Sequence, residues 1–181
     1  DNLAGGDSTF HGVVGSWCVK LFDLGVAGTG LTLAGAQRAG YDAVATHITA
    51  VDRAHFYPEH GLMSLELVAE RGTRRVLGLQ GVSVMGDALI GKINTIAAML
   101  PYKPTVSDVS NAEVAYSPPF AAAMDILNTV ANAADNILAG QNKGIPVTEF
   151  ARLWDDAGSN IQVIDCRENT QGGPLEEKHP G

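Results

Sequence analysis

The sequence predicts an α+β fold with a mostly antiparallel sheet flanked by helices. Three observations lead to this class: strand-like segments precede the long helix-like segments, two of the strands are joined by a hairpin-sized polar loop, and no internal repeat runs along the chain. The chain has 181 residues, of which 45% are hydrophobic and 18% are charged, so it is long enough to build its own core.

Alternation of apolar and polar residues predicts the strands. Residues 16–23 place Trp17, Val19 and Leu21 on one face. The small residues 25–30 that follow are expected to form a turn. Three further strands are expected at residues 43–50, 63–70 and 75–85, the last two joined by the polar residues 71–74.

Two helices are predicted around these strands. Residues 33–39 form a short helix with Thr29 or Thr32 as its cap and Gly40 as its stop. A second helix ends at Pro101 and shows apolar residues at helical spacing. Its apolar face consists of Leu89, Ile93, Ile96, Ala97 and Leu100.

The second half of the chain is predicted to be mainly helical. Residues 120–138 are expected to form the longest helix and residues 148–154 a short one. The intervening stretch behaves differently: residues 108–116 are expected to be irregular, and the adjacent prolines forbid regular structure around them. Residues 161–165 (IQVID) are expected to form a further strand.

Charge and cysteine content exclude several classes of function. The formal net charge is −8, so the chain lacks the basic character that a binder of nucleic acid needs. No apolar run is long enough to span a bilayer, so no membrane partner is expected. Cys18 and Cys166 lie far apart and form no CxxC pair, which favours a reducing, cytoplasmic location.

Two glycine motifs resemble nucleotide-binding sequences without completing them. Residues 86–92 match GxxxxGK, but Ile93 stands where a hydroxyl would bind magnesium, so the start of a helix is the preferred interpretation. Gly28 and Gly30 begin a dinucleotide-like pattern, but Leu33 occupies the position of its third glycine.

The remaining reactive side chains also favour structural interpretations. The five histidines show no paired metal-ligand spacing, and no metal site is expected. Cys18 lies within a predicted strand and is expected to be a small buried hydrophobe rather than a nucleophile.

Two proline-rich segments are the strongest candidates for a site. Residues 55–59 (HFYPE) contain Tyr57 and residues 116–120 (YSPPF) begin with Tyr116. Proline restricts the backbone and can hold a phenol at a fixed angle, which suits recognition of a flat ring or proton donation to a thiolate. The alternative is that both segments are aromatic plugs over the end of the sheet.

These segments, with their surroundings, resemble a known family over about residues 10–140. The runs SWCVKLFDLGVAGTGLTLAGAQRAGYDA, HFYPE, LVAERGTRRVLGLQGVSVMG and YSPPFAAAMDILNTVANAADNIL occur in order and look like the C-terminal dimerisation domain of FAD-dependent pyridine nucleotide–disulfide oxidoreductases. Relatives of glutathione reductase carry a His–Glu pair near HPTxxE, whereas YSPPF stands in that region here. The chain therefore resembles the branch of coenzyme A-disulfide reductases, NADH oxidases and NADH peroxidases.

The resemblance implies the roles of several residues. In coenzyme A-linked members, tyrosines from one subunit reach the active site of its partner; by position these correspond to Tyr116 and Tyr57. Pro118, Pro119 and Phe120 are implied to lie against the cofactor. The homodimeric enzyme would use FAD and NAD(P)H on a thiol or disulfide substrate, while this chain alone is expected to bind neither cofactor tightly and to be inactive.

The resemblance also implies the domain organisation. Residues 1–10 resemble the tail of a preceding FAD domain, and residues 11–140 would be the dimerisation domain. Residues 141–158 would be a linker with a short helix. Residues 159–181 resemble the start of a rhodanese domain, and the chain, which begins at Asp1 without Met, is expected to be cut from a longer protein.

Several alternatives stay open at this point. The acceptor of the whole enzyme could be coenzyme A disulfide, a persulfide, a polysulfide or oxygen. The chain could also be a non-catalytic interaction module, in which case changes at Tyr57 and Tyr116 would affect only stability or dimerisation.

Overall fold

A computed structural model describes residues 2–156 and 162–164 of the chain. The chain divides into two compact units, residues 1–143 and residues 144–181, and each is described by itself. The first unit contains the sheet and most of the helices. After a short 3₁₀ turn, η1 (Asn2–Ala4), its N-terminal segment leads into the first strand.

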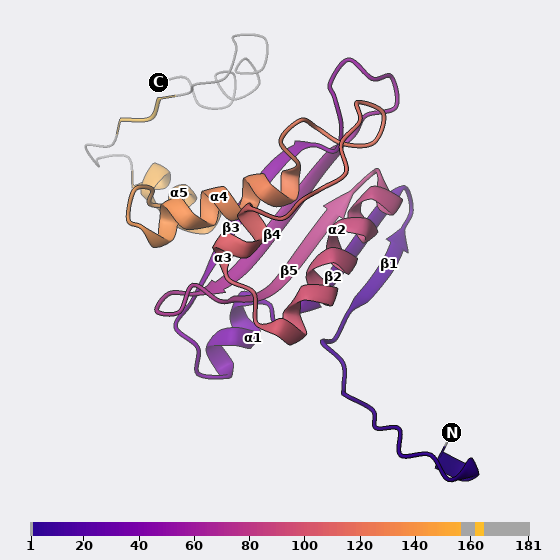
Figure 1. Ribbon diagram of the computed structural model, residues 1–181. Helices are drawn as coiled ribbons and strands as arrows, with labels where there is room; N and C mark the ends of the chain where they lie inside the picture. The colour runs from indigo at the N-terminus through magenta and orange to yellow at the C-terminus, as the bar shows by residue number, and fades with distance from the viewer. Residues whose placement is uncertain (1, 157–161, 165–181) are drawn as a thin grey trace. The chain divides into compact units, whose positions relative to one another are not determined.

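An antiparallel sheet of five strands forms the centre of the first unit (Figure 1). Its spatial order is β1-β2-β5-β4-β3. The strands are β1 (Trp17–Leu21), β2 (Leu24–Gly30), β3 (Ala43–Val51), β4 (Leu62–Glu70) and β5 (Val76–Ser83). The predicted fold class and four of the five predicted strands, those before residue 86, are confirmed.

Strand β2 occupies residues for which the sequence predicted a turn, so that prediction was wrong. The turn lies two residues earlier, at Phe22 and Asp23, where Phe22 has a positive φ of 54° and lets β1 and β2 pair as a tight hairpin. The glycines of β2 permit close contacts instead. A Cβ on Gly25 would lie 2.8 Å from the Cα of Gly86, and one on Gly28 would lie 3.0 Å from the ring of Trp17.

Two helices cover one face of the sheet. Helix α2 (Gly86–Met99) packs against β2 and β5, and α4 (Ile126–Leu138) packs against β3 and β4 (Figure 1). Helix α3 (Val106–Ser110) packs against α4. Between the helices and the sheet lies the main core, whose largest fully buried side chains include Met63, Leu65, Leu67, Leu79, Leu89, Ile96 and Leu127.

The helix boundaries confirm some predictions and correct others. Helix α1 (Leu33–Arg38) begins where Thr32 accepts a hydrogen bond of 3.1 Å from the amide of Gly35, and Gly40 follows it with a φ of 87°. Helix α2 passes into a 3₁₀ turn, η2 (Leu100–Tyr102), at the predicted proline.

Two predictions in the second half were wrong. Helix α3 extends over residues 108–110, the beginning of the stretch predicted to be irregular, because Thr105 and Asp108 make a reciprocal capping box. Helix α4 begins at Ile126 rather than at Phe120, because the buried Asp125 caps it by accepting from the amide of Leu127 at 2.9 Å. The longest helix among the described residues is therefore α2.

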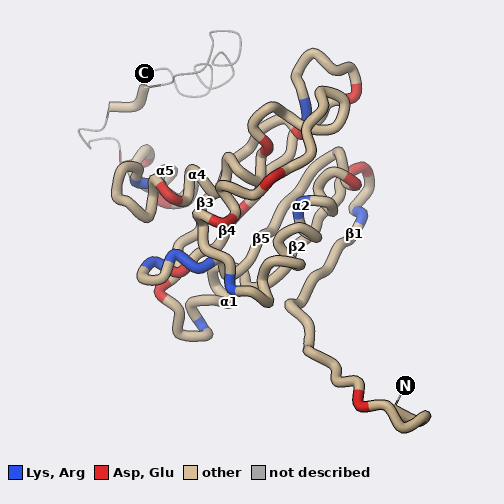
Figure 2. The backbone as a smooth tube through the Cα atoms, in the orientation of Figure 1, with Lys and Arg blue, Asp and Glu red and all other residues tan. Residues whose placement is uncertain are grey.

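The face of the sheet opposite α2 and α4 carries exposed apolar side chains on β1 and β2 and polar side chains on β3 and β4. On β1 and β2 it presents exposed apolar residues, among them Trp17, Val19, Leu21 and Leu24. Strands β3 and β4 present Thr49 and Ser64 there, whose hydroxyls are 2.7 Å apart, and, two residues further along each strand, the paired His47 and Glu66. Figure 2 shows that most backbone positions of the strands are uncharged and that basic and acidic positions are interspersed along the described chain.

The second unit contains helix α5 (Val147–Asp155), which corresponds to the predicted short helix. Within it, Arg152 donates a hydrogen bond to Glu149 at 2.8 Å. This hydrogen bond and the attraction between the charges lower the pKa of the Glu149 carboxyl and raise the pKa of the Arg152 guanidinium. Residues 162–164 have no regular secondary structure; the rest of the strand predicted at 161–165, and nearly all of the rhodanese-like segment, lie outside the described residues. In the described part of the chain, no helix combines the length and the apolar character needed to cross a bilayer.

Candidate functional site: two aromatic loops at one end of the sheet

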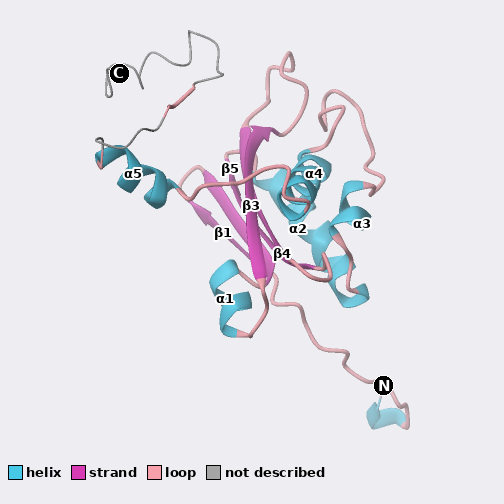
Figure 3. Cartoon of the chain, turned by 90° about the vertical axis from the view of Figure 1, so that its left-hand side faces the viewer, coloured by secondary structure: helices cyan, strands magenta, loops and turns pink. Residues whose placement is uncertain are grey.

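Two long loops project from the same end of the sheet, as the views in Figures 1 and 3 both show. The first, the Tyr57 loop (residues 52–61), joins β3 to β4, and the second, the Tyr116 loop (residues 111–125), joins α3 to α4. The structure thus brings both predicted tyrosines to one end of the first unit. Within the described residues, no hydrogen bond or ring contact joins Tyr57 to Tyr116.

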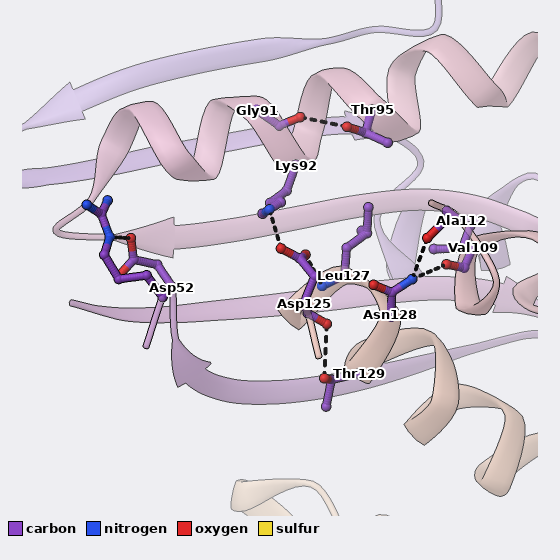
Figure 4. A network of polar contacts seen from close by, with 11 residues as sticks. Asp52, Gly91, Lys92, Thr95, Val109, Ala112, Asp125, Leu127, Asn128 and Thr129 are labelled. Carbon is purple, nitrogen blue, oxygen red and sulfur yellow. Dashed lines mark hydrogen bonds and ion pairs between the residues drawn. The ribbon is translucent and has the colours of Figure 1, made fainter. Parts of the chain in front are cut away.

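The Tyr57 loop is closed at its base by Asp52. The backbone N–H of Asp52 donates to the carbonyl of Gly61 at 2.9 Å, and its buried carboxylate accepts from the amide of Gly61 at 2.8 Å. The other carboxylate oxygen accepts from Arg53 Nε at 2.7 Å, a contact drawn in Figure 4. A buried carboxylate needs such partners, so the two ends of the loop are fixed to each other.

Inside this loop, turns fix the backbone of Tyr57. Its amide donates to the carbonyl of Ala54 at 2.9 Å, and its own carbonyl accepts from the amide of His60 at 3.2 Å. The Tyr57 side chain is half-buried, whereas Phe56 is exposed and meets the ring of His55 edge-on, with centroids 5.6 Å apart. The loop therefore presents an aromatic surface on a restrained backbone.

In the Tyr116 loop, Pro118 and Pro119 occupy the middle of a tight turn. The carbonyl of Ser117 accepts from the amides of Phe120 at 2.8 Å and Ala121 at 3.0 Å. Both prolines are half-buried, while Tyr116 is 53% and Phe120 74% exposed. The aromatic side chains on either side of the turn therefore do not pack as plugs within this unit.

The two arms of the Tyr116 loop and helix α4 line an open pocket of about 400 Å³. Residues 110–114 and Tyr116 line one side, and residues 121–125 line the other. From α4, Asn128 and Asn132 also line the pocket. The tyrosine thus lies at the margin of a cavity with several polar groups.

Polar contacts fix both ends of this loop, as Figure 4 shows. The side-chain amide of Asn128 donates to the carbonyls of Val109, Ser110 and Ala112 at 3.2, 3.1 and 3.0 Å. At the other end, Lys92 Nζ on α2 lies 2.5 Å from Asp125 Oδ2. Sequence reasoning missed Asn128 and Asp125; an Asp directly before an apolar helical run was the one available signal.

The structure confirms the helical interpretation of residues 86–92 and changes the interpretation of the other candidate motifs. Residues 86–92 all lie in helix α2, and Lys92 is paired with Asp125, so this GxxxxGK match forms no phosphate-binding loop. Gly28 and Gly30 lie in an antiparallel strand rather than in a turn before a helix. Cys18 is exposed on the edge strand β1, so the prediction that it is buried was wrong. Among residues 2–156 and 162–164, no group of three His, Cys, Asp or Glu side chains could hold a metal ion.

An antiparallel sheet with α2 and α4 on one face, exposed apolar residues on β1 and β2 of the other face, and two aromatic loops at one end defines, within the described residues, an α+β module that presents surfaces for contact. Comparison with known proteins gives its family. The chain belongs to the pyridine nucleotide-disulphide oxidoreductase dimerisation domain family, whose model matches residues 17–127.

The chain is similar to the following three proteins, among others. The NAD(P)H coenzyme A polysulfide/persulfide reductase of Pyrococcus horikoshii is 38% identical over 130 residues, which are 72% of this chain and 28% of that protein. A solved FAD-dependent pyridine nucleotide-disulphide oxidoreductase from Desulfovibrio vulgaris is 52% identical, with a TM-score of 0.62, over 76% of this chain and 30% of that one. The reduced CoADR-RHD of Bacillus anthracis is 28% identical with a TM-score of 0.81, over 93% of this chain and 29% of that one. The chain therefore spans less than a third of the length of these relatives.

Proposed function

We propose that this chain is the interface domain of a homodimeric, FAD- and NAD(P)H-dependent oxidoreductase that acts on coenzyme A disulfide, persulfide or polysulfide. In this proposal, Tyr116 and Tyr57 contribute to the active site of the partner subunit. The observation that carries it is the placement of both tyrosines on restrained loops at one end of the sheet. The family match and the reductases among the relatives support the reaction class.

Dimerisation is supported by the exposed apolar residues of this unit. Trp17, Val19 and Leu21 on β1, together with Phe120 and Met124 in the Tyr116 loop, are all exposed. Burial of such side chains stabilises an interface, and a two-fold interface presents the same residues from both copies. An isologous contact would carry the loops of each subunit toward the other.

In the part of the chain that the structure describes, neither glycine motif forms a nucleotide-binding loop that could hold FAD. The glycine pattern at Gly28 and Gly30 belongs to an antiparallel strand, and the GxxxxGK match is helical. We therefore place the flavin and nicotinamide sites in other parts of the enzyme, and Pro118, Pro119 and Phe120 as surfaces that approach the flavin only across the dimer. In this proposal the chain supplies the dimer contact that positions the two subunits, and the tyrosine hydroxyl that donates a hydrogen bond to the substrate.

Tyr116 is proposed to donate from its phenolic O–H to the substrate sulfur. When a disulfide bond is cleaved by an attacking thiolate, one sulfur leaves as a thiolate and needs a hydrogen bond or a proton. A tyrosine hydroxyl can give either. The exposed position of Tyr116 beside a polar cavity leaves room for such a substrate.

The first experiment measures the mass of the chain in solution by size-exclusion chromatography with light scattering over a range of concentrations. We expect a mass twice the 18.9 kDa of the chain, independent of concentration. A monomer at every concentration would contradict the proposal that residues 1–181 contain the interface.

The second experiment tests the tyrosine in the full-length reductase that contains this sequence. Tyr116→Phe is expected to lower kcat with coenzyme A disulfide by about a hundredfold, with the flavin content per subunit unchanged. Tyr102→Phe, at an exposed tyrosine of η2, is the matched control and should leave kcat unchanged. Normal kinetics of Tyr116→Phe, with a change only in stability or dimerisation, would instead support the non-catalytic interaction module.

A further inference from the structure

We infer that Asn128 and the Lys92–Asp125 ion pair are positioning residues that fix the Tyr116 loop at its two ends. The inference rests on the proposed function, because it explains how the phenol of Tyr116 is held. It adds residues from α2 and α4 that the sequence does not connect with the Tyr116 loop (Figure 4).

Asn128 fixes the start of the loop. Its side-chain amide is partly buried, and its nitrogen donates to three carbonyl oxygens between 3.0 and 3.2 Å away, those of Val109, Ser110 and Ala112. An amide nitrogen has two hydrogens, so three acceptors use its whole donor capacity. Asparagine does not favour a helix interior, so helix stability does not explain this residue, whereas its contacts with the loop do.

The Lys92–Asp125 pair fixes the end of the loop to a different helix. One carboxylate oxygen of Asp125 lies 2.5 Å from Lys92 Nζ, and the other accepts from the amide of Leu127 at 2.9 Å. The side chains are 13% and 3% exposed, so water screens this pair little. Because α2 packs on β2 and β5, the last residue of the loop is tied to the helix layer over the centre of the sheet.

The middle of the loop lacks comparable support. Between residues 113 and 124 only Ala121 is buried, whereas Tyr116 is 53% and Met124 62% exposed beside the pocket of about 400 Å³. Core packing therefore acts on this segment at Ala121 alone, and the contacts at the two ends of the loop are its main polar supports. One further contact acts at the start: Ser110 Oγ donates to Asn132 Oδ1 at 2.5 Å.

Hydrogen exchange of the chain itself tests this inference without any assay of activity. Asn128→Asp keeps the shape of the side chain but replaces the donor with an acceptor that faces three carbonyls. The amides of Asn111 and Ala112, which hydrogen-bond at the start of the loop, are expected to exchange about tenfold faster. Asn136→Asp, on the exposed side of the same helix, is the matched control and should leave these amides unchanged.

Lys92→Met tests the end of the loop, at exchange times too short for strands β4 and β5 to exchange through global unfolding. At these times the amides of Phe120, Ala121 and Leu127 are expected to exchange about tenfold faster than in the unmodified chain, while the amides of β4 and β5 stay protected. Unchanged exchange in the loop, or an increase of the same size in β4 and β5 at these short times, would overturn the inference, since either result would show no specific control of the loop.

A kinetic cycle separates this inference from the proposed function. In the full-length reductase, Asn128→Asp should lower kcat about tenfold when Tyr116 is present and less than twofold in the Tyr116→Phe background. If Tyr116→Phe alone has no effect, the proposed function fails whatever the exchange shows. If Tyr116→Phe is slow but Asn128→Asp lowers kcat equally in both backgrounds, the tyrosine role stands and the positioning role is overturned.

Discussion

The most informative prediction concerns the stability that the Lys92–Asp125 pair contributes. Lys92→Met removes the cation but keeps the length of the side chain, and it leaves a carboxylate that is 3% exposed without its countercharge. Removing one partner of a buried pair costs about 3–5 kcal/mol. Since the amide of Leu127 still donates to Asp125, we expect a value near the lower limit, about 3 kcal/mol.

Urea denaturation of the chain, followed by circular dichroism at 222 nm and by tryptophan fluorescence, measures this loss. Arg71→Met is the control, because Arg71 lies 3.5 Å from Asp42 in a pair that is 51% and 78% exposed; it should change the free energy of unfolding by less than about 0.5 kcal/mol. Adding Asp125→Asn to Lys92→Met should restore about 1 kcal/mol, since asparagine still caps α4 and carries no charge. A loss for Lys92→Met no larger than that for Arg71→Met would refute the reasoning.

Two further predictions concern the sheet and helix α3. Gly81→Ala would place a Cβ 2.6 Å from Leu89 Cδ1 and should destabilise the chain by about 1–3 kcal/mol in urea denaturation, whereas Gly72→Ala, with nothing within 4 Å, should not. Hydrogen bonds from the backbone N–H and the hydroxyl of Thr105 lower the pKa of Asp108, so NMR titration of Thr105→Val should show a higher pKa that is still below the usual value. Because the folded-state pKa is the lower one, this carboxyl stabilises the fold above the unfolded pKa, and that contribution is lost as the pH falls below about 4.

Periodicity and local capping carried most of the correct sequence predictions. Strands β3 to β5 were found because apolar residues alternate or run continuously between polar loops, and α1 because Thr32 and Gly40 mark its ends. Strand β2 was missed because its glycines and small residues are typical of turns. In the folded chain these positions allow α2 and the ring of Trp17 to approach the strand, a requirement that only the tertiary structure shows.

The sequence predicted the candidate site as two aromatic segments restrained by prolines. It did not predict how the fold places these two segments relative to each other. The prolines correctly placed Tyr57 and Tyr116 outside helices and strands. That both loops leave the same end of the sheet depends on the strand order β5-β4-β3 and on α4 packing against β3 and β4, which no local pattern encodes. The role of each tyrosine in a reaction stays a prediction.

The error at the start of α4 shows why the supporting residues were missed. A helix from residue 120 would have put Met124 on the buried face, with Leu127 and Val130, and would have treated the polar residues as its solvated side. In the structure the cap at Asp125 leaves residues 120–124 outside the helix, and Met124 is 62% exposed. The polar positions at 125, 128 and 132 then form a stripe at helical spacing that lines the cavity under the Tyr116 loop, while the opposite stripe of the same helix fills the core. The amphipathic pattern therefore predicted correctly which side of α4 packs in the core. Its polar side holds the Tyr116 loop. Only the position of the cap at Asp125 shows that these polar side chains contact the loop rather than solvent.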